Sequence, residues 1–199
     1  MSLLELLRSD AARQYHFAGR KVNRVGNVAL LKVLFSPRFA PVLLYRLAAR
    51  CAMRHLRPLG KLFSLMNFVV FGIEIGLNCE IGPGLYFPHT SGTVLGARRI
   101  GSNAVIYHNV TVGAKVPDLA YDDGLRPEIG NDVMLGAGSK ILGPITLGDG
   151  VVVAANAVVV HSMPSGCLVV GVPGRASEKH LEYPPTSGDV PASYSSEDL

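Results

Sequence analysis

Two histidines, His89 and His108, stand nineteen residues apart in a stretch whose aliphatic residues otherwise recur every six positions. A hydroxyl group becomes a useful nucleophile when a base removes its proton, and an imidazole that titrates near neutral pH is suited to that task. The two side chains are therefore candidates for acid–base chemistry on a hydroxyl substrate. Whether they meet depends on the elements that carry them.

The aliphatic repeat extends over nearly a hundred residues. Its members are, in three registers, Ile75, Ile81, Phe87; Val94, Ile100, Ile106, Val112; and Ile129, Leu135, Ile141, Leu147, Val153, Val159. A period of six fits neither a helix nor a simple alternating strand. It is typical of a coil of short strands in which one aliphatic side chain per repeat points inward and a small residue allows a tight corner. Stacked coils pair their strands in parallel at about 4.8 Å, so the predicted fold is mainly β, a β-solenoid.

The period is interrupted twice. Seven residues separate Phe87 from Val94, which puts one extra residue inside PHTSGTV, and the polar segment 114–128 is predicted to loop out of the coil. Three hexapeptides make one turn, so with the extra residue His108 is predicted to lie one coil above His89, about one strand spacing away. Two imidazoles this close disfavour simultaneous protonation, which keeps a base neutral. The alternative is that His108 faces solvent or lines a groove.

The first seventy residues form a basic helical region in this prediction. Residues 1–72 hold 12 Lys or Arg against 2 Asp or Glu. A helix is expected to begin with Ser36 as N-cap and Pro37 at its first position and to end at Pro58 and Gly60. Arginines recur on one stripe of it, at Arg46, Arg50, Arg54 and Arg57. This region either contacts an anionic partner such as a membrane surface, or is a solvated face that packs on the base of the coil.

Compartment and metal use follow from cysteine and histidine placement. Cys51, Cys79 and Cys167 are far apart without metal-type spacing, so reduced thiols in a cytoplasmic protein are predicted. The start of the chain does not read as a secretory signal, and its apolar runs are too short to span a membrane. No close histidine pair of the HxxxxH type occurs, so no metal is expected. Residues 177–199, rich in Pro, Ser and acids, are predicted to form a flexible tail.

Three stretches carry a family resemblance: FGIEIGLNCEIGPGLYFPHTSGTVLGARRIGSNAVIYHNVTVGA, IGNDVMLGAGSKILGPITLGDGVVVAANAVVV and MPSGCLVVGVPGRA. Together they resemble the serine acetyltransferase branch of the hexapeptide-repeat acyltransferases, over residues 71–176. The resemblance implies a left-handed parallel β-helix, a homotrimer, and acetyl-CoA bound in the groove between neighbouring subunits. It also implies that His89 is the general base and that a carboxylate at Glu74 orients it, although the family generally has Asp there. His108 is assigned a secondary role in acceptor or thioester contact.

The same resemblance assigns binding residues. The positions matching the family's cofactor contacts are Gly113, Ala114, Ala137, Ser139, Lys140, Ala155 and Arg175. Small side chains let a pantetheine arm lie against the coil, and the two basic residues suit the CoA phosphates. The alternative for the small residues is the tight corner geometry that the repeat itself demands. Thr90 and Arg126 are predicted to contact the acceptor.

The acceptor itself is where this chain departs from the family pattern. Serine acetyltransferases generally have Asp directly before the catalytic histidine, whereas Pro88 stands here, and their Arg-His-Pro loop element reads Leu125, Arg126, Pro127. The short basic N-terminal region resembles that of acetyltransferases in exopolysaccharide and colanic acid type pathways. A saccharide hydroxyl is therefore the first predicted acceptor, with L-serine as the alternative and no nucleic acid as partner. From a different class, the chain is a non-catalytic trimeric scaffold whose groove or tail, ending in Leu199, docks a partner.

Overall fold

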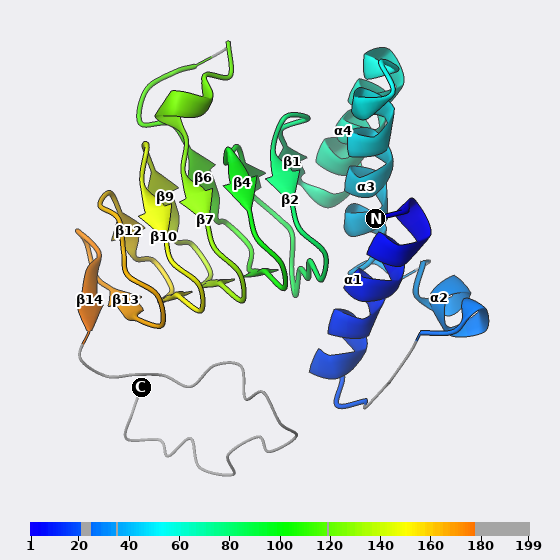
Figure 1. The fold of residues 1–199 in the computed structure, drawn as a ribbon, viewed down its shortest axis with the longest axis horizontal. Coiled ribbons are helices and arrows are strands. Elements are labelled where there is room, and N and C mark those ends of the chain that lie inside the picture. Colours follow the sequence, from blue (N-terminus) through cyan, green and yellow to red (C-terminus); the bar gives the residue numbers. More distant parts are fainter. Residues whose placement is uncertain (21–24, 35, 119, 178–199) are drawn as a thin grey trace.

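Four helices precede a coil of short strands (Figure 1). The computed structural model describes residues 1–20, 25–34, 36–118 and 120–177, so the predicted tail lies outside the described residues apart from Ser177. The helices are α1 (Leu3–Phe17), α2 (Asn27–Leu34), α3 (Ala40–Met53), α4 (Arg57–Phe71) and the 3₁₀ turn η1 (Asp123–Leu125). The strands are β1 (Ile73–Ile75), β2 (Glu80–Ile81), β3 (Thr93–Leu95), β4 (Arg99–Ile100), β5 (Val105–Ile106), β6 (Thr111–Gly113), β7 (Glu128–Ile129), β8 (Met134–Leu135), β9 (Lys140–Leu142), β10 (Thr146–Leu147), β11 (Val152–Val153), β12 (Val158–Val159), β13 (Leu168–Val170) and β14 (Arg175–Ser177).

The strands form three sheets that run along the coil. Their orders are β1-β3-β6-β9-β12, β2-β4-β7-β10 and β5-β8-β11-β13-β14. All neighbours pair in parallel except β14, which runs antiparallel to β13. The predicted mainly β fold with parallel coils is thus confirmed.

Strand register measures the length of each turn. In a regular turn Ile129 pairs with Leu147, eighteen residues on. The turn that contains His89 is one residue longer, because Ile81 pairs with Ile100. The next turn has twenty-nine residues, eleven more than a regular turn, because Ile100 pairs with Ile129. Both interruptions of the repeat are therefore confirmed, as one added residue and one looped-out segment.

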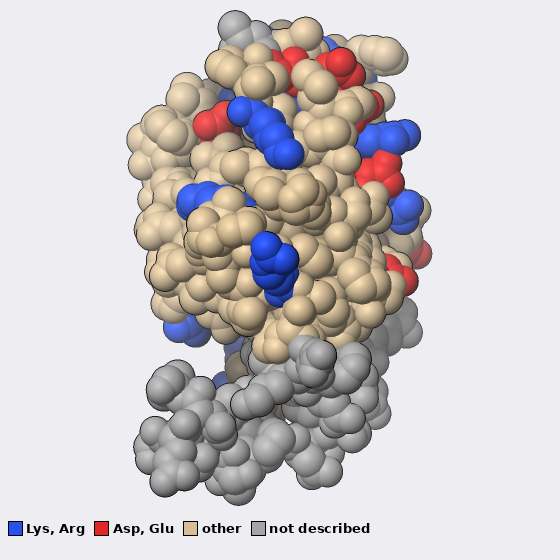
Figure 2. Space-filling view, turned by 90° about the vertical axis from the view of Figure 1, so that its left-hand side faces the viewer, with Lys and Arg blue, Asp and Glu red and all other residues tan. Residues whose placement is uncertain are grey.

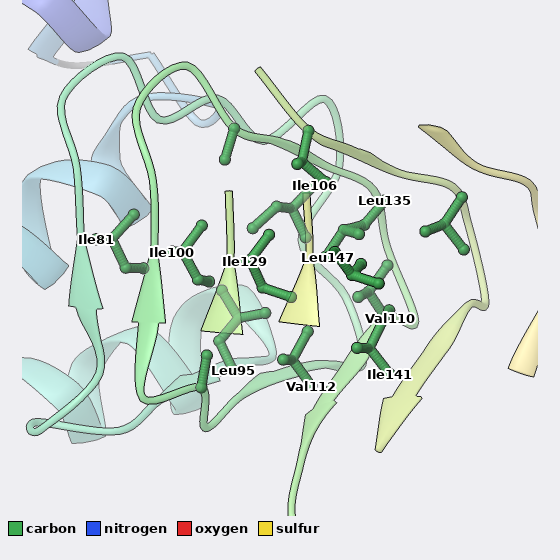
Figure 3. Packing of buried hydrophobic residues seen from close by; sticks show 14 of the residues in the cluster. Ile81, Leu95, Ile100, Ile106, Val110, Val112, Ile129, Leu135, Ile141 and Leu147 are labelled. Atoms are coloured by element: carbon green, nitrogen blue, oxygen red, sulfur yellow. The ribbon is translucent and has the colours of Figure 1, made fainter. Parts of the chain in front are cut away.

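The core holds two side chains from most repeats, not the single one predicted. Figure 3 shows the expected aliphatic residues lying side by side from coil to coil, as Ile81, Ile100, Ile129 and Leu147 do. The residue two positions earlier is also buried, because alternate residues of a strand share a face. This second set includes Ala104, Val110, Val133, Ser139, Ile145, Val151 and Ala157.

One predicted core position is wrong. Val94 is 38% exposed, whereas its neighbours Thr93 and Leu95 are 0% and 1% exposed. Phe87 and Leu95 are thus eight residues apart, and only five residues lead from Leu95 to Ile100. The interval from Phe87 to Leu95, which contains PHTSGT, is therefore two residues longer than a regular repeat, and the interval after it is one residue shorter, which leaves a net addition of one residue in this turn. The hydroxyl group of the buried Thr93 has a hydrogen-bond partner, because its Oγ1 donates to the backbone oxygen of Tyr107 (3.1 Å).

The predicted bounds of the main N-terminal helix are also wrong. Its residues divide between α3 and α4, and Pro41 rather than Pro37 lies in the first turn of α3. Ser36 instead closes a short turn, because its backbone oxygen accepts from the N–H groups of Phe39 and Ala40 (2.9 Å each). Phe39, 1% exposed, anchors this turn in the core of the helical region.

Gly60 does not end a helix but lies buried inside α4. A Cβ at this position would stand 2.9 Å from the backbone oxygen of Ala48 in α3. The missing side chain therefore allows α3 and α4 to cross closely.

A buried ion pair joins the helices to the first coil. Arg46 donates from Nε and Nη2 to the two carboxylate oxygens of Asp10 (2.9 Å each), and from Nη1 and Nη2 to the backbone oxygens of Ile81 and Gly82 (2.6 and 2.7 Å). Burial raises the pKa of Asp10, and the hydrogen bonds and charge of Arg46 oppose that rise. Arg46 thus does not belong to an exposed arginine stripe, because its side chain is only 3% exposed.

The surface of α4 is strongly apolar. Its exposed large apolar residues are Leu59, Leu62, Leu65, Met66, Phe68, Val69 and Val70. None of the helices in the described ranges is long and apolar enough to cross a membrane. The opposite end of the molecule, which carries β14, faces the viewer in Figure 2 and shows scattered Lys and Arg side chains together with Asp and Glu side chains. Residues 1–72 hold 12 of the 19 Lys and Arg residues, so the positive charge of the chain is concentrated on its helical half.

Candidate active site

His89 lies on an exposed turn that the added residue creates. The turn follows the buried Phe87 and ends at the buried Thr93. It is tied to the end of α4, because Thr90 Oγ1 donates to the backbone oxygen of Phe71 (2.9 Å). Thr90, a predicted acceptor contact, therefore has one visible role in this structure, which is to hold the His89 turn.

His108 lies next to His89, as the nineteen-residue spacing predicts. The ring centroids are 5.7 Å apart and the rings meet edge to face, with an interplanar angle of 86°. Nδ1 of His108 is buried and has no hydrogen-bond partner among the described residues. A buried ring nitrogen without a partner is a position that a substrate, a water molecule or a neighbouring chain can satisfy.

Glu74, the predicted carboxylate partner of His89, lies on the sheet that contains β3, the strand that follows the His89 turn. Glu74 is exposed on β1, opposite Val94 of β3. Among the described residues no hydrogen bond joins Glu74 to His89. The orienting role of Glu74 remains a prediction.

Three of the predicted site residues continue the column that begins at His89. Backbone hydrogen bonds link successive coils here, from Gly138 N to His108 O (2.9 Å) and from Asn156 N to Ala137 O (2.8 Å). His108, Ala137 and the exposed Ala155 therefore lie near one corner on successive coils. Lys140 belongs to the same region, since its Nζ donates to the backbone oxygen of Asn109.

Gly113 and Ala114 lie at the other end of this sheet. Four residues lie between His108 and Gly113, and the turn at Asn109, whose φ is 56°, keeps the span below the roughly 17 Å that a fully extended segment would cover. A Cβ at Gly113 would meet no atom within 4 Å, whereas a Cβ at Gly101 would stand 2.5 Å from the backbone oxygen of Gly130 in the next coil. Coil stacking thus explains Gly101 but leaves Gly113 facing open space.

Two predicted cofactor contacts lie elsewhere. The side chain of Ser139 has no exposed surface, because it occupies the second core position of its repeat. Its side chain therefore does not line an outer groove, and a cofactor-binding role of Ser139 through its backbone remains a prediction. Arg175 is exposed on β14, at the closing end of the coil.

Arg126 anchors the looped-out segment. Its Nη1 donates to the backbone oxygen of Gly96 (2.9 Å), its Nη2 donates to Asp118 Oδ2 (2.6 Å), and its guanidinium lies 3.5 Å from the ring centroid of Tyr121. Burial acts to raise the pKa of Asp118, but the hydrogen bonds and charge of Arg126 outweigh it and lower that pKa. The side chain of Arg126 is thus occupied by the loop, and its predicted contact with an acceptor remains a prediction.

A cavity of about 440 Å³ opens beside His89. Its lining comes from three elements that are distant in sequence, the turn before α3, the end of α4 and the His89 turn: Pro37, Arg38, Val70, Phe71, Gly72, Phe87, Pro88, His89, Thr90 and Ser91. The size is that of a small-molecule site. Sequence reasoning missed Arg38, although its place in SPR before a helix start was a local signal. In the described part of the chain, no group of three or more His, Cys, Asp or Glu side chains is placed to hold a metal ion.

Comparison with known proteins agrees with this architecture. The family model "Bacterial transferase hexapeptide (six repeats)" matches residues 126–161. A serine acetyltransferase of Helicobacter pylori strain J99 is 36% identical over 148 residues, which are 74% of this chain and 85% of the relative.

Solved structures extend the likeness to the helices. The crystal structure of Neisseria gonorrhoeae serine acetyltransferase aligns with a TM-score of 0.76 and 27% identity over 92% of this chain and 69% of that one. A Brucella abortus serine acetyltransferase solved in complex with coenzyme A aligns with a TM-score of 0.73 and 28% identity over 86% of this chain and 66% of that one. The identity and coverage of the Helicobacter pylori relative show that this chain, an acyltransferase, belongs to the serine acetyltransferase family.

Proposed function

We propose that the chain transfers an acetyl group from acetyl-CoA to a hydroxyl acceptor, with L-serine as the first acceptor to test. The observation that carries this proposal is the column of His89, His108, Ala137 and Ala155 beside a small-molecule cavity. The sequence ranked a saccharide hydroxyl first. The relatives are serine acetyltransferases, and they support L-serine better.

In the proposed reaction His89 takes the proton of the acceptor hydroxyl as the new O–C bond forms at the thioester carbonyl. The C–S bond then breaks, and the proton passes to the leaving sulfur, so that the products are an O-acetyl ester and free CoA. Backbone N–H groups near Gly113 are the proposed donors to the oxyanion, and they are proposed to come from the neighbouring subunit of the trimer, because within one chain Gly113 lies at the opposite end of β6 from His108. Glu74 is proposed to orient His89.

The co-substrate is proposed to lie along the outer face of the β1-β3-β6-β9-β12 sheet, whose strand β6 ends at Gly113. Support comes from the open space at Gly113, the small Ala137 and Ala155, and the basic Lys140. Arg175 lies at the closing end of another sheet, and its contact with the CoA phosphates remains a prediction. Left-handed winding and a homotrimer, with a neighbouring subunit completing the groove, are part of the same proposal. The Brucella abortus serine acetyltransferase solved in complex with coenzyme A supports the choice of acetyl-CoA as co-substrate.

Release of free CoA from acetyl-CoA, measured with L-serine and with a panel of sugars, tests the function. We expect His89→Ala to lower kcat by about 10²- to 10⁴-fold, because the base is lost. The matched control is His161→Ala, which removes an exposed histidine near the closing turn and should leave kcat unchanged. Wild-type turnover by a folded His89→Ala protein contradicts the assignment.

A saccharide hydroxyl is the second candidate acceptor. None of the described residues that line the cavity is acidic, and Pro88 lies where the family generally has Asp, so no carboxylate stands ready for the ammonium group of serine. Selective turnover of a sugar over L-serine in the same screen would establish this candidate.

Peripheral contact with the cytoplasmic face of a membrane is also proposed. Residues 36–71 contain six Lys or Arg and no Asp or Glu, and α4 exposes a row of apolar side chains. Flotation with anionic vesicles tests this, because replacing the exposed Leu62 and Leu65 with Ser should abolish co-flotation. Co-flotation of this variant would contradict the contact. Docking of a partner by the tail concerns residues outside those described.

A further inference from the structure

The cavity beside His89 carries an uncompensated positive charge. Arg38 lines it, is exposed, and makes no hydrogen bond and no ion pair with any described residue. Its charge acts on the nearby Tyr86: burial raises the pKa of that phenol, and the charge of Arg38 opposes the rise. The guanidinium is therefore available to a ligand.

The backbone of Arg38 is held in place. It lies between Pro37, whose ring fixes φ, and the buried Phe39, within the turn that the backbone oxygen of Ser36 closes. Ser36 Oγ in turn accepts from Gln14 Nε2 of α1 (3.3 Å). These contacts fix the point on the cavity rim from which the Arg38 side chain extends.

The remainder of the lining is apolar or neutral apart from His89. The walls include Val70, Phe71, Phe87 and Pro88, and none of the described lining residues is acidic. An unpaired guanidinium in such surroundings binds carboxylate or phosphate oxygens through charge-assisted hydrogen bonds, which are about twice as strong as neutral ones.

From this geometry we infer that Arg38 binds an anionic group of the acceptor while His89 acts on its hydroxyl. The acceptor class is a hydroxylated carboxylate or phosphate, which includes L-serine through its carboxylate and acidic sugars through a uronate or phosphate. Arg38 is then a specificity residue rather than a catalytic one. This inference rests on the proposed acetyl transfer.

Acceptor pairs that differ in the anion test it. L-Serine is compared with L-serinamide, and D-glucuronate and D-glucose 6-phosphate are each compared with D-glucose, which separates carboxylate from phosphate recognition. We expect the wild-type protein to favour the anionic member of its preferred pair by about ten- to a hundredfold in kcat/KM, the range for a charge-assisted hydrogen bond. Arg38→Met should reduce this preference to below about threefold, and Arg38→Lys should keep part of it.

Arg54→Met is the matched control. Arg54 is an exposed arginine at the other end of α3, about 21 Å away along the helix, so its removal should leave the preference unchanged. The inference is overturned if the wild-type protein accepts neutral and anionic members equally, or if Arg38→Met keeps the full preference.

Calorimetric titration of the same compounds, without acetyl-CoA, separates the two proposals. Binding of an anion that depends on Arg38, without turnover of any acceptor, would sink the acetyl transfer and leave the anion site. Turnover without anion preference would sink the anion site and leave the acetyl transfer.

Discussion

Removal of the Asp10 carboxylate tests how the helices are joined to the coil. Asp10 Oδ1 accepts from the backbone N–H groups of Gly84 and Leu85 (2.9 and 2.8 Å) in addition to the two hydrogen bonds from Arg46. In Asp10→Ala two buried N–H groups lose their acceptor, and the buried guanidinium keeps only the backbone oxygens of Ile81 and Gly82.

The expected cost follows from these contacts. Each orphaned N–H group costs about 1–3 kcal/mol, and breaking a buried ion pair by removing one partner costs about 3–5 kcal/mol in all. We expect Asp10→Ala to lower the free energy of unfolding by at least about 4 kcal/mol, which is the middle of the range for the broken ion pair alone. The double variant Asp10→Ala/Arg46→Met should be less destabilised than the sum of the two single variants, because it leaves no unpaired buried charge.

Urea unfolding followed by far-ultraviolet circular dichroism, at one protein concentration, measures the free energy of unfolding of the wild-type protein, the two single variants and the double variant. A cost below about 1 kcal/mol for Asp10→Ala, or strict additivity in the double variant, would refute the reasoning. Because Arg38 and His89 come from the two halves that this pair joins, Asp10→Ala should also raise the KM of the acceptor.

The other predictions concern the loop, the outer face and the helix crossing. The pKa of Asp118 is lowered, so its ion pair stabilises the loop above about pH 4, and this stabilisation is lost as pH falls through the lowered pKa. The backbone N–H of Asp122 donates to Asp118 Oδ2, so its amide chemical shift should follow this loss in the wild-type protein and should not do so in Asp118→Asn. Gly113→Leu should leave the melting temperature unchanged and raise the KM of acetyl-CoA at least about tenfold, whereas Gly101→Leu should lower the melting temperature. The reverse pattern would contradict the proposal that acetyl-CoA binds at Gly113. Gly60→Val should cost about 1–3 kcal/mol by forcing α3 and α4 apart, and an unchanged melting temperature would count against their close crossing.

The coil was predictable because its signal repeats. Each aliphatic residue confirms the phase of the others, so turn length and both interruptions follow from spacing alone. The phase fails only at Val94 and Leu95, where two aliphatic residues are adjacent and either fits the pattern. Which one enters the core depends on how the PHTSGT turn and the following corner share one added residue.

The helical region was less predictable because its signals are single. Pro37 and Pro41 each mark a helix start, and burial of Phe39 decides between them. Asp10 and Arg46 are far apart in the sequence, and no local sequence pattern predicts that they pair. Arg46 therefore looked like one member of an exposed stripe.

The candidate site divides in the same way. The proximity of His89 and His108 follows from counting residues per turn. The place of Arg38 beside the same cavity as His89 depends on how the helices dock on the coil, which the spacing of the repeats does not encode.

The antiparallel strand β14 determines how the coil can change in length. A parallel stack leaves an unpaired edge at each end, and such edges recruit other chains. Here β14 pairs antiparallel with β13 at the last coil of one sheet, and α4 packs against β1 at the first coil of another. These elements interrupt the parallel repeat at its two ends, whereas in the middle eighteen further residues in register would add one coil of about 4.8 Å. The molecule is therefore a stack that can be lengthened from within, which makes the distance between its acceptor end and its closing end an adjustable quantity.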